Sequence, residues 1–307
     1  MRVFVTGAPG FIGSAIVQEL IGAGHQVLGL AGSEAGAKSL IAAGAKVHRG
    51  GLEDLESVRS GAAVADAVIH TAFFHDFSKF AENCEIDKRA IGTLDSALEG
   101  SERPLLVTSG LATVARGRTP TEQDAPLPPS LAYPRASEAT AETLLKRGVR
   151  VSVVRLPQVH NNVKQGLVTY TIALAREKRV SAYAADGLNR WAAVHVLDAA
   201  RVYRLALEKH EAGARYHAVA EEGVPYRNFA EAIGRGLKVP VVSKSPAAHF
   251  GWLGMFVNHD LMGSSGETQR RLEWRPGGPG LIADLEQMRY SESAADSIFA
   301  TTGRASR

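Results

Sequence analysis

The sequence is poor in cysteine and has no long hydrophobic run. Its 307 residues include a single cysteine, Cys84, which excludes an intrachain disulfide and any metal site built on paired cysteines. No segment reaches the roughly 18 consecutive apolar residues that a membrane-spanning helix needs. Met1 leads directly into a strand-like run, which leaves no room for a signal peptide. We therefore expect a cytoplasmic protein with no membrane partner and no bound metal.

An excess of one charge is also missing. The chain has 35 Lys and Arg against 32 Asp and Glu, a formal net charge of +3, and its basic residues are scattered. A nucleic-acid partner is therefore not expected, because such a surface concentrates Lys and Arg in a patch or stripe. Hydrophobic residues make up 45% of the chain, enough for a sizeable buried core.

Strand-like and helix-like segments alternate through the first half of the sequence. The expected strands are residues 2–5, 26–30, 45–48, 67–70, 104–108 and 151–155, with a late strand at 215–219. The expected helices are residues 12–23, 34–43, 52–62, 80–98, 137–147, 167–176 and 226–236, and a strand edge plus helix at 192–207. Strands that are separated by helices predict a doubly wound parallel sheet, the Rossmann type of α/β fold.

The pattern loosens after residue 155. Residues 157–162 are expected to form a loop, and the sequence from 239 onward shows no regular pattern. We predict a dinucleotide-binding Rossmann domain at 1–160, completed by 190–220. A small C-terminal substrate-binding cap is predicted from 161–189 and 221–290, and a frayed tail at 291–307.

The strongest functional motif follows the first strand. Residues 6–13 read T-G-A-P-G-F-I-G and lead directly into a helix. Gly7 permits a tight turn, Gly10 lets a pyrophosphate approach the backbone, and Gly13 lets the helix pack on the sheet. The N–H groups at the start of the helix, near Phe11, would face the phosphates. The cofactor-binding residues predicted here are Thr6, Gly7, Gly10, Phe11, Ile12 and Gly13.

The spacing T-G-x-x-G-x-x-G resembles the extended short-chain dehydrogenase/reductase superfamily, which contains the NAD-dependent epimerases and dehydratases. Similar segments occur at 70–72, 108–110, 155–157 and 194–200. The resemblance implies an NAD(P)-dependent oxidoreductase with a small-molecule substrate, and a homodimer. It also implies that Thr71, Ala72 and Pro157 lie beside the cofactor.

The end of the second strand indicates which dinucleotide is bound. An acidic residue there would bind the ribose 2′-hydroxyl of NAD, but residues 30–33 read L-A-G-S. Relatives that prefer NADP often carry Arg where this chain has Gly32. Ser33 is able to hydrogen-bond a 2′-phosphate, so we expect NADP(H) to be favoured over NAD(H). Gly51 replaces an Asp that relatives place near the adenine, which predicts weaker binding of the adenosine end.

Catalysis in the superfamily uses a Ser or Thr, a Tyr, and a Lys four residues after the Tyr. Tyr133 matches the tyrosine, but the lysine position holds Ser137, one helical turn further on. Ser137 is able to bond a ribose hydroxyl but brings no charge to lower the pKa of a phenol from its ordinary value of about 10. On a helix Arg135 would point elsewhere, and Lys146 lies too far along the chain to substitute.

The hydroxyl partner of Tyr133 is ambiguous. The usual triplet places Gly110 at the catalytic position, so Ser109 lies one residue early and Thr113 is the nearest hydroxyl beyond it. We favour Ser109.

Histidines are further candidates for proton transfer, because an imidazole titrates near neutral pH. His70 ends the fourth strand, His75 follows it, and His160 lies in the segment that borders the nicotinamide in relatives. His195 and Asp198 are expected to hold the cap to the sheet.

The expected function is NAD(P)H-dependent reduction of a carbonyl in a small, fairly apolar substrate, with Tyr133 and Ser109 supplying the proton. One alternative is a dinucleotide-binding protein without turnover, favoured by Gly32, Gly51 and Ser137. Another is an NAD-dependent epimerase or dehydratase. A sugar-nucleotide substrate would need basic residues in the cap, which offers only scattered ones such as Arg270 and Arg271.

Overall fold

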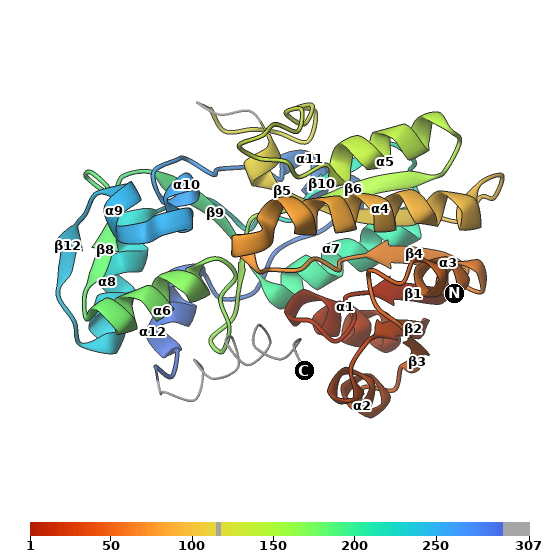
Figure 1. The fold of residues 1–307 in the computed structure, drawn as a ribbon, viewed down its shortest axis with the longest axis horizontal. Coiled ribbons are helices and arrows are strands. Elements are labelled where there is room, and N and C mark those ends of the chain that lie inside the picture. Colours follow the sequence, from red (N-terminus) through yellow and green to blue (C-terminus); the bar gives the residue numbers. More distant parts are fainter. Residues whose placement is uncertain (115–117, 291–307) are drawn as a thin grey trace.

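Seven parallel strands form the centre of the molecule (Figure 1). The computed structural model describes residues 1–114 and 118–290, so the predicted tail at 291–307 lies outside the described residues. The strands are β1 (Arg2–Thr6), β2 (Gln26–Ala31), β3 (Lys46–Arg49), β4 (Ala67–His70), β5 (Leu105–Gly110), β6 (Val151–Leu156) and β10 (Arg215–His217). Their order is β10-β6-β5-β4-β1-β2-β3, and every neighbouring pair is parallel. The predicted Rossmann fold is confirmed.

Helices cover both faces of this sheet, as Figure 1 shows. One layer holds α1 (Phe11–Gly22), α2 (Glu34–Ala42) and α7 (Val196–Lys209), and the other holds α3 (Leu55–Ala63), α4 (Phe80–Leu98) and α5 (Ser137–Lys146). Side chains alternate across a strand, so Val3 and Val5 of β1 join the core under the first layer. Phe4, between them, joins the core under the second layer.

The C-terminal half adds two small sheets and several helices. In one sheet, β9 (Arg190–His195) pairs parallel with β7 (Gln158–His160) and antiparallel with β11 (Glu221–Pro225). In the other, β8 (Ser181–Tyr183) pairs with β12 (Val241–Ser243). The helices are α6 (Val168–Lys178), α8 (Tyr226–Leu237), α9 (Pro246–Phe250), α10 (Gly254–Val257), α11 (Gly266–Leu272) and α12 (Leu281–Gln287). Short 3-10 turns are η1 (Phe77–Lys79), η2 (Leu111–Thr113) and η3 (Gly251–Leu253).

Sequence patterns missed much of this half. The expected loop at 157–162 contains β7, and the stretch after 239 contains β12 and four helices. Buried aromatic side chains hold these short elements together, with Trp191, Tyr226 and Phe229 in one cluster. We call this part the cap, without α11, which packs against α7 and against β10 of the Rossmann sheet; the domain boundaries given above stay a prediction.

A buried charge cluster fastens the sheet edge at β6 and β10. The Arg155 side chain has no solvent exposure, and its Nε donates to Glu138 of α5 at 3.0 Å. Another guanidinium nitrogen lies 3.1 Å from His217 of β10, and Arg215 also donates to Glu138. Arg155 therefore has a structural role at this sheet edge. Pro157 follows it in the chain, between β6 and β7.

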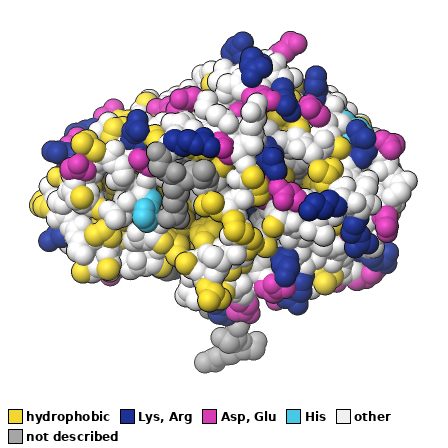
Figure 2. Space-filling view, turned by 90° about the horizontal axis from the view of Figure 1, so that it is seen from above, with side chains coloured by type: hydrophobic (Ala, Val, Ile, Leu, Met, Phe, Trp, Pro, Cys, Tyr) yellow, Lys and Arg dark blue, Asp and Glu magenta, His cyan; other side chains and the backbone are white. Residues whose placement is uncertain are grey.

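Charged groups on the surface are mixed in sign. Figure 2 shows Lys and Arg side chains interspersed with Asp and Glu on the face that it views. Within residues 1–114 and 118–290, no helix combines the length and apolar character needed to cross a membrane.

Candidate functional site

The carboxyl ends of β1 and β4 form the centre of the candidate site. The chain leaves β1 towards β2 on one side, and it leaves β4 towards β5 on the other. Such a point of reversal in a parallel sheet creates a crevice in which dinucleotides bind. The predicted cofactor residues of the first strand and those of the fourth meet at this crevice.

Gly7 makes the turn that opens the crevice. Its φ is +67°, a left-handed conformation that favours glycine. A Cβ at Gly7 would lie 2.8 Å from the backbone of Ala72 and 2.9 Å from the hydroxyl of Thr71. The close contact places Thr71 and Ala72 directly against the glycine loop; their contact with the cofactor stays a prediction.

Gly10 and Gly13 have different roles in this loop. A Cβ at Gly13 would collide with the carbonyl of Gly7, so Gly13 allows α1 to pack against the end of β1. A Cβ at Gly10 would meet one described atom within 4 Å, the Gly7 oxygen at 3.0 Å. Gly10 is exposed in front of the helix that begins at Phe11. The surface beside the first helical N–H groups is therefore open, and a dinucleotide pyrophosphate fits it.

Thr6 supports the glycine loop from the interior of the protein. It is fully buried, its hydroxyl lies 3.0 Å from Nδ1 of His70, and it accepts a hydrogen bond from Ala72 N. The Thr71 hydroxyl donates to the Thr6 carbonyl at 2.7 Å. The Thr6 side chain is therefore used to join β1 to β4, and a contact of Thr6 with the cofactor stays a prediction.

The adenosine end of the crevice lies beyond β2. Ser33 caps α2 by accepting a hydrogen bond from Gly36 N, and it is exposed, so its hydroxyl proton is able to reach a phosphate. Arg49, at the end of β3, pairs with Glu34 at 2.7 Å, and both side chains are more than half exposed. Sequence reasoning missed Arg49 because its place beside α2 depends on strand order. A Cβ at Gly51 would meet nothing described within 4 Å.

The cap contributes one cation near the glycine loop. Lys164 Nζ lies 5.7 Å from the ring centroid of Phe11, the first residue of α1. The side-chain oxygen of Asn161 accepts hydrogen bonds from the backbone of Val163 and Lys164 and fixes this turn. The Lys164 charge therefore adds to the positive end of α1, where anions are stabilised.

Tyr133 lies between the sheet edge and the cap. Its ring centroid is 5.4 Å from that of Phe80, at the start of α4, and 6.3 Å from that of Phe256 in α10. Phe77 stacks on Trp252 of the cap at 4.1 Å, which continues the same aromatic cluster. Figure 2 shows hydrophobic side chains gathered near the middle of its face.

The segment around Tyr133 differs from the sequence-based prediction. The helix α5 begins only at Ser137, so Tyr133 does not lie one helical turn before it. Pro134 was the available signal, because a residue that precedes proline disfavours the helical region. Arg135, expected to point elsewhere, instead donates from Nε to the Ser137 hydroxyl at 3.0 Å.

Ser137 itself is 1% exposed, and its hydroxyl donates to Asp87 at 2.5 Å. Ser137 therefore already uses its hydroxyl within the protein, and its contact with a ribose stays a prediction. Asp87 also lies 3.0 Å from Nε2 of His70. Burial would raise the pKa of Asp87, but the hydrogen bond from His70, the charge of Arg135 and the Ser137 hydroxyl hold it below its usual value. Asp87 carries no local sequence signal, because both partners are distant in the chain.

The other candidate groups for proton transfer include Ser109, Thr113 and His160. Ser109 is 2% exposed on β5, and nothing is described of the Thr113 side chain. His160 is fully buried and lies 2.7 Å from Asp284 of α12, so it ties β7 to α12 within the cap. Its place beside the nicotinamide stays a prediction.

His75 is exposed at the mouth of the crevice. Enough protein surrounds it that desolvation, followed by the charge of Arg135, lowers its pKa to about 4. His75 is therefore neutral at pH 7. His70, with both ring nitrogens hydrogen-bonded, serves the β1–β4 junction.

Two further expectations concern the cap. Asp198 accepts hydrogen bonds from the backbone of Gly277 and Gly278, so it does hold the C-terminal segment to α7. His195 caps the same helix. Arg271 lies on α11 beside α7, and it pairs with Glu211 at 3.1 Å. It therefore belongs to the Rossmann side and not to the cap.

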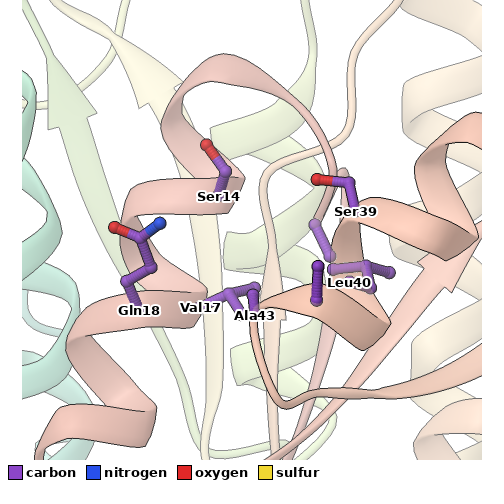
Figure 3. A pocket seen from close by; sticks show the side chains of 8 residues that line it. Ser14, Val17, Gln18, Ser39, Leu40 and Ala43 are labelled. Carbon is purple, nitrogen blue, oxygen red and sulfur yellow. The ribbon is translucent and has the colours of Figure 1, made fainter.

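A separate pocket opens between α1 and α2 (Figure 3). Side chains that line it include Ser14 and Gln18 from α1 and Ser39 from α2. It lies between two helices on one face of the sheet. The carboxyl edge, with its open helix N-terminus, is therefore the better site for a dinucleotide.

The contrast between Gly10 and Gly13 yields a prediction. Gly10→Val should abolish dinucleotide binding and lower the melting temperature only slightly, because its Cβ meets a single backbone atom, the Gly7 oxygen at 3.0 Å, and the rest of the side chain enters the space before α1. Gly13→Val should lower the melting temperature much more, because it collides with Gly7. Calorimetric titration and thermal unfolding separate the two effects. Unchanged dinucleotide affinity in Gly10→Val would contradict the assignment of this site.

Comparisons with known proteins agree with this geometry. An uncharacterized Schizosaccharomyces pombe protein is 46% identical, over 94% of this chain and 100% of that protein. The Stigmatella aurantiaca 4-hydroxy-2-methyl-3-oxo-4-farnesyl-3,4-dihydroquinoline-1-oxide ketoreductase is 28% identical, over 82% of this chain and 80% of its own length. The Thermus thermophilus UDP-glucose 4-epimerase complex with NAD has a similar structure, with a TM-score of 0.73 and 22% identity, over 94% of this chain and 99% of that one.

Residues 3–220 match the NAD dependent epimerase/dehydratase family. This range contains the whole parallel sheet, the glycine loop and Tyr133. The chain therefore belongs to the NAD-dependent epimerase/dehydratase family.

Proposed function

We propose that this protein is an NADP(H)-dependent reductase that converts the carbonyl of a small, apolar molecule into an alcohol. The observation that carries the proposal is the place of Tyr133 between Phe80 of α4 and Phe256 of the cap's aromatic cluster. The similarity to a ketoreductase of Stigmatella aurantiaca supports the same reaction class.

Carbonyl reduction needs a hydride at carbon and a proton at oxygen. A bound dinucleotide supplies the hydride from its nicotinamide. In the proposed reaction Tyr133 donates its phenolic proton to the substrate oxygen, as a general acid. An uncharged phenol is able to donate a proton at neutral pH, so reduction does not need Tyr133 to be ionised beforehand. Ser109 is proposed to orient the same oxygen.

The aromatic cluster supports an apolar substrate. Phe77, Phe80, Tyr170, Trp252 and Phe256 form a continuous series of ring contacts beside Tyr133. Rings of this kind bury apolar surface and exclude water from the reacting carbon.

The preference for NADP(H) is proposed from the adenosine end. Ser33 and Arg49 lie at the ends of neighbouring strands, where they offer a hydroxyl and a guanidinium to a 2′-phosphate. Arg binds phosphate through charge-assisted hydrogen bonds. Glu34 pairs with Arg49 in this structure. In the proposed complex Arg49 leaves Glu34 and pairs with the 2′-phosphate, which is the stronger anion.

A second candidate, dinucleotide binding without turnover, is favoured by the burial of Ser137 at the position of the family lysine. It predicts normal cofactor affinity together with no reduction of any carbonyl. Assays with NADPH and a panel of aldehydes and ketones distinguish it from the reductase.

Tyr133→Phe should reduce the kcat for NADPH-dependent carbonyl reduction by about a hundredfold or more, because the proton donor is lost. Its affinity for NADPH should stay unchanged. Tyr170→Phe is the matched control, because its hydroxyl donates to the His75 carbonyl and lies in the same cluster. A Tyr133→Phe variant as active as the control would exclude Tyr133 as the proton donor.

Arg49→Gln should weaken NADPH binding about tenfold and leave NADH binding unchanged, since it removes a hydrogen bond to a charged group. Glu34→Gln releases Arg49 and should strengthen NADPH binding. Fluorescence titration with both dinucleotides gives the ratio of affinities. If neither substitution alters that ratio, Arg49 has no part in cofactor choice.

A further inference from the structure

The guanidinium of Arg135 occupies the space beside the family's lysine position. Its Nε donates to Ser137 Oγ, and its central carbon lies 4.1 Å from the ring centroid of Phe73. Phe73 follows Thr71 and Ala72, which contact the glycine loop at the end of β4. The charge of Arg135 therefore lies between α5 and the crevice wall, although its residue precedes the helix.

We infer that Arg135 takes over the role of the lysine that relatives carry at position 137, holding the ribose next to the nicotinamide and supplying the fixed positive charge of the crevice. This inference deepens the proposed function and rests on it for the catalytic half of the role. The cofactor-binding half rests on the dinucleotide crevice alone.

The chemistry of the side chain suits this role. A guanidinium has five N–H donors, and within the described part of the chain Arg135 uses only Nε in a hydrogen bond. Its two terminal nitrogens thus have donors left for hydroxyl groups. The charge is permanent at any physiological pH, and its position over Phe73 is favourable for a cation.

The surrounding groups show how far this charge acts. Its positive charge helps to lower the pKa of His75 in the loop after β4 and of Asp87 on α4. It also favours lower pKa values of Cys84 on α4 and Tyr203 on α7, against the effect of burial. Asp87 is the anion among them, and the Ser137 hydroxyl separates it from the guanidinium. Arg135 is therefore held by hydrogen bonding to Ser137 and is not tied to Asp87 in a direct ion pair.

The arrangement also explains why a serine stands at 137. A lysine there would place its ammonium near the same anion, and Arg135 would lose the hydroxyl that accepts from its Nε. Ser137 is small, is 1% exposed, and links Arg135 to Asp87. It is a positioning residue, whereas Arg135 carries the charge.

The test compares Arg135→Gln, Arg135→Lys and the double variant Arg135→Gln/Ser137→Lys, with Arg89→Gln of α4 as a control for the loss of a surface charge. Calorimetric titration with NADPH and with NADH measures binding, and thermal unfolding reports folding. Arg135→Gln should weaken both dinucleotides about ten- to a hundredfold, as expected when a hydrogen bond to a charged group is lost. Arg135→Lys should lose less, and the double variant should regain affinity.

Activity adds an independent result. Arg135→Gln should lower kcat for carbonyl reduction, and the double variant should recover part of it, whereas Arg89→Gln should alter neither. If Arg135→Gln fails to fold, the folded Arg135→Lys and double variants still decide, because both retain a cation and should bind dinucleotide.

Unchanged affinity in a folded Arg135→Gln variant would overturn the inference, as would a double variant that binds no better than Arg135→Gln. A wild type that reduces no carbonyl, but whose dinucleotide affinity depends on Arg135, would refute the proposed function and leave the cofactor-binding role intact.

Discussion

The buried carboxylate of Asp87 is the interaction on which the rest of the site depends. A charge that is 1% exposed is costly unless it is fully hydrogen-bonded, and Asp87 meets this requirement with His70 on one oxygen and Ser137 on the other. His70 is in turn hydrogen-bonded to Thr6, at the start of the glycine loop. Through Ser137 it holds Arg135, so one carboxylate on α4 links the glycine loop to Arg135.

The two ends of this crevice are built differently. At the nicotinamide end, buried hydrogen bonds and an aromatic cluster fix the groups before any ligand arrives, which reduces the entropy lost on binding. At the adenosine end, Arg49 and Glu34 form an exposed pair, and the space beside Gly51 is open. Exposed pairs of this kind contribute little to stability. In the proposed function, the adenosine end selects the cofactor and the other end orients the reacting groups.

Much of the Rossmann half could be predicted from sequence, because its strands are continuous apolar runs and the glycines of residues 6–13 have individual steric roles. The cap could not, since strands of three residues such as β7 and β8 carry too little periodicity. The direction of the Arg135 side chain was predicted wrongly because the residues between Tyr133 and Ser137 were taken as helical. Pro134 disfavours a helix there. Sequence patterns could not identify Asp87, because its hydrogen-bond partners His70 and Ser137 lie 17 and 50 residues away along the chain.

The central claim is that a dinucleotide lies across the carboxyl edge with its nicotinamide half beside Arg135. A crystal structure of the protein in complex with NADP⁺ tests it most directly. The pyrophosphate should accept hydrogen bonds from the backbone N–H groups of Phe11 and Ile12, and a ribose hydroxyl should lie within hydrogen-bonding distance of the Arg135 guanidinium. A dinucleotide bound between α1 and α2 would contradict this claim, as would a ribose held at the edge with Arg135 turned away from it.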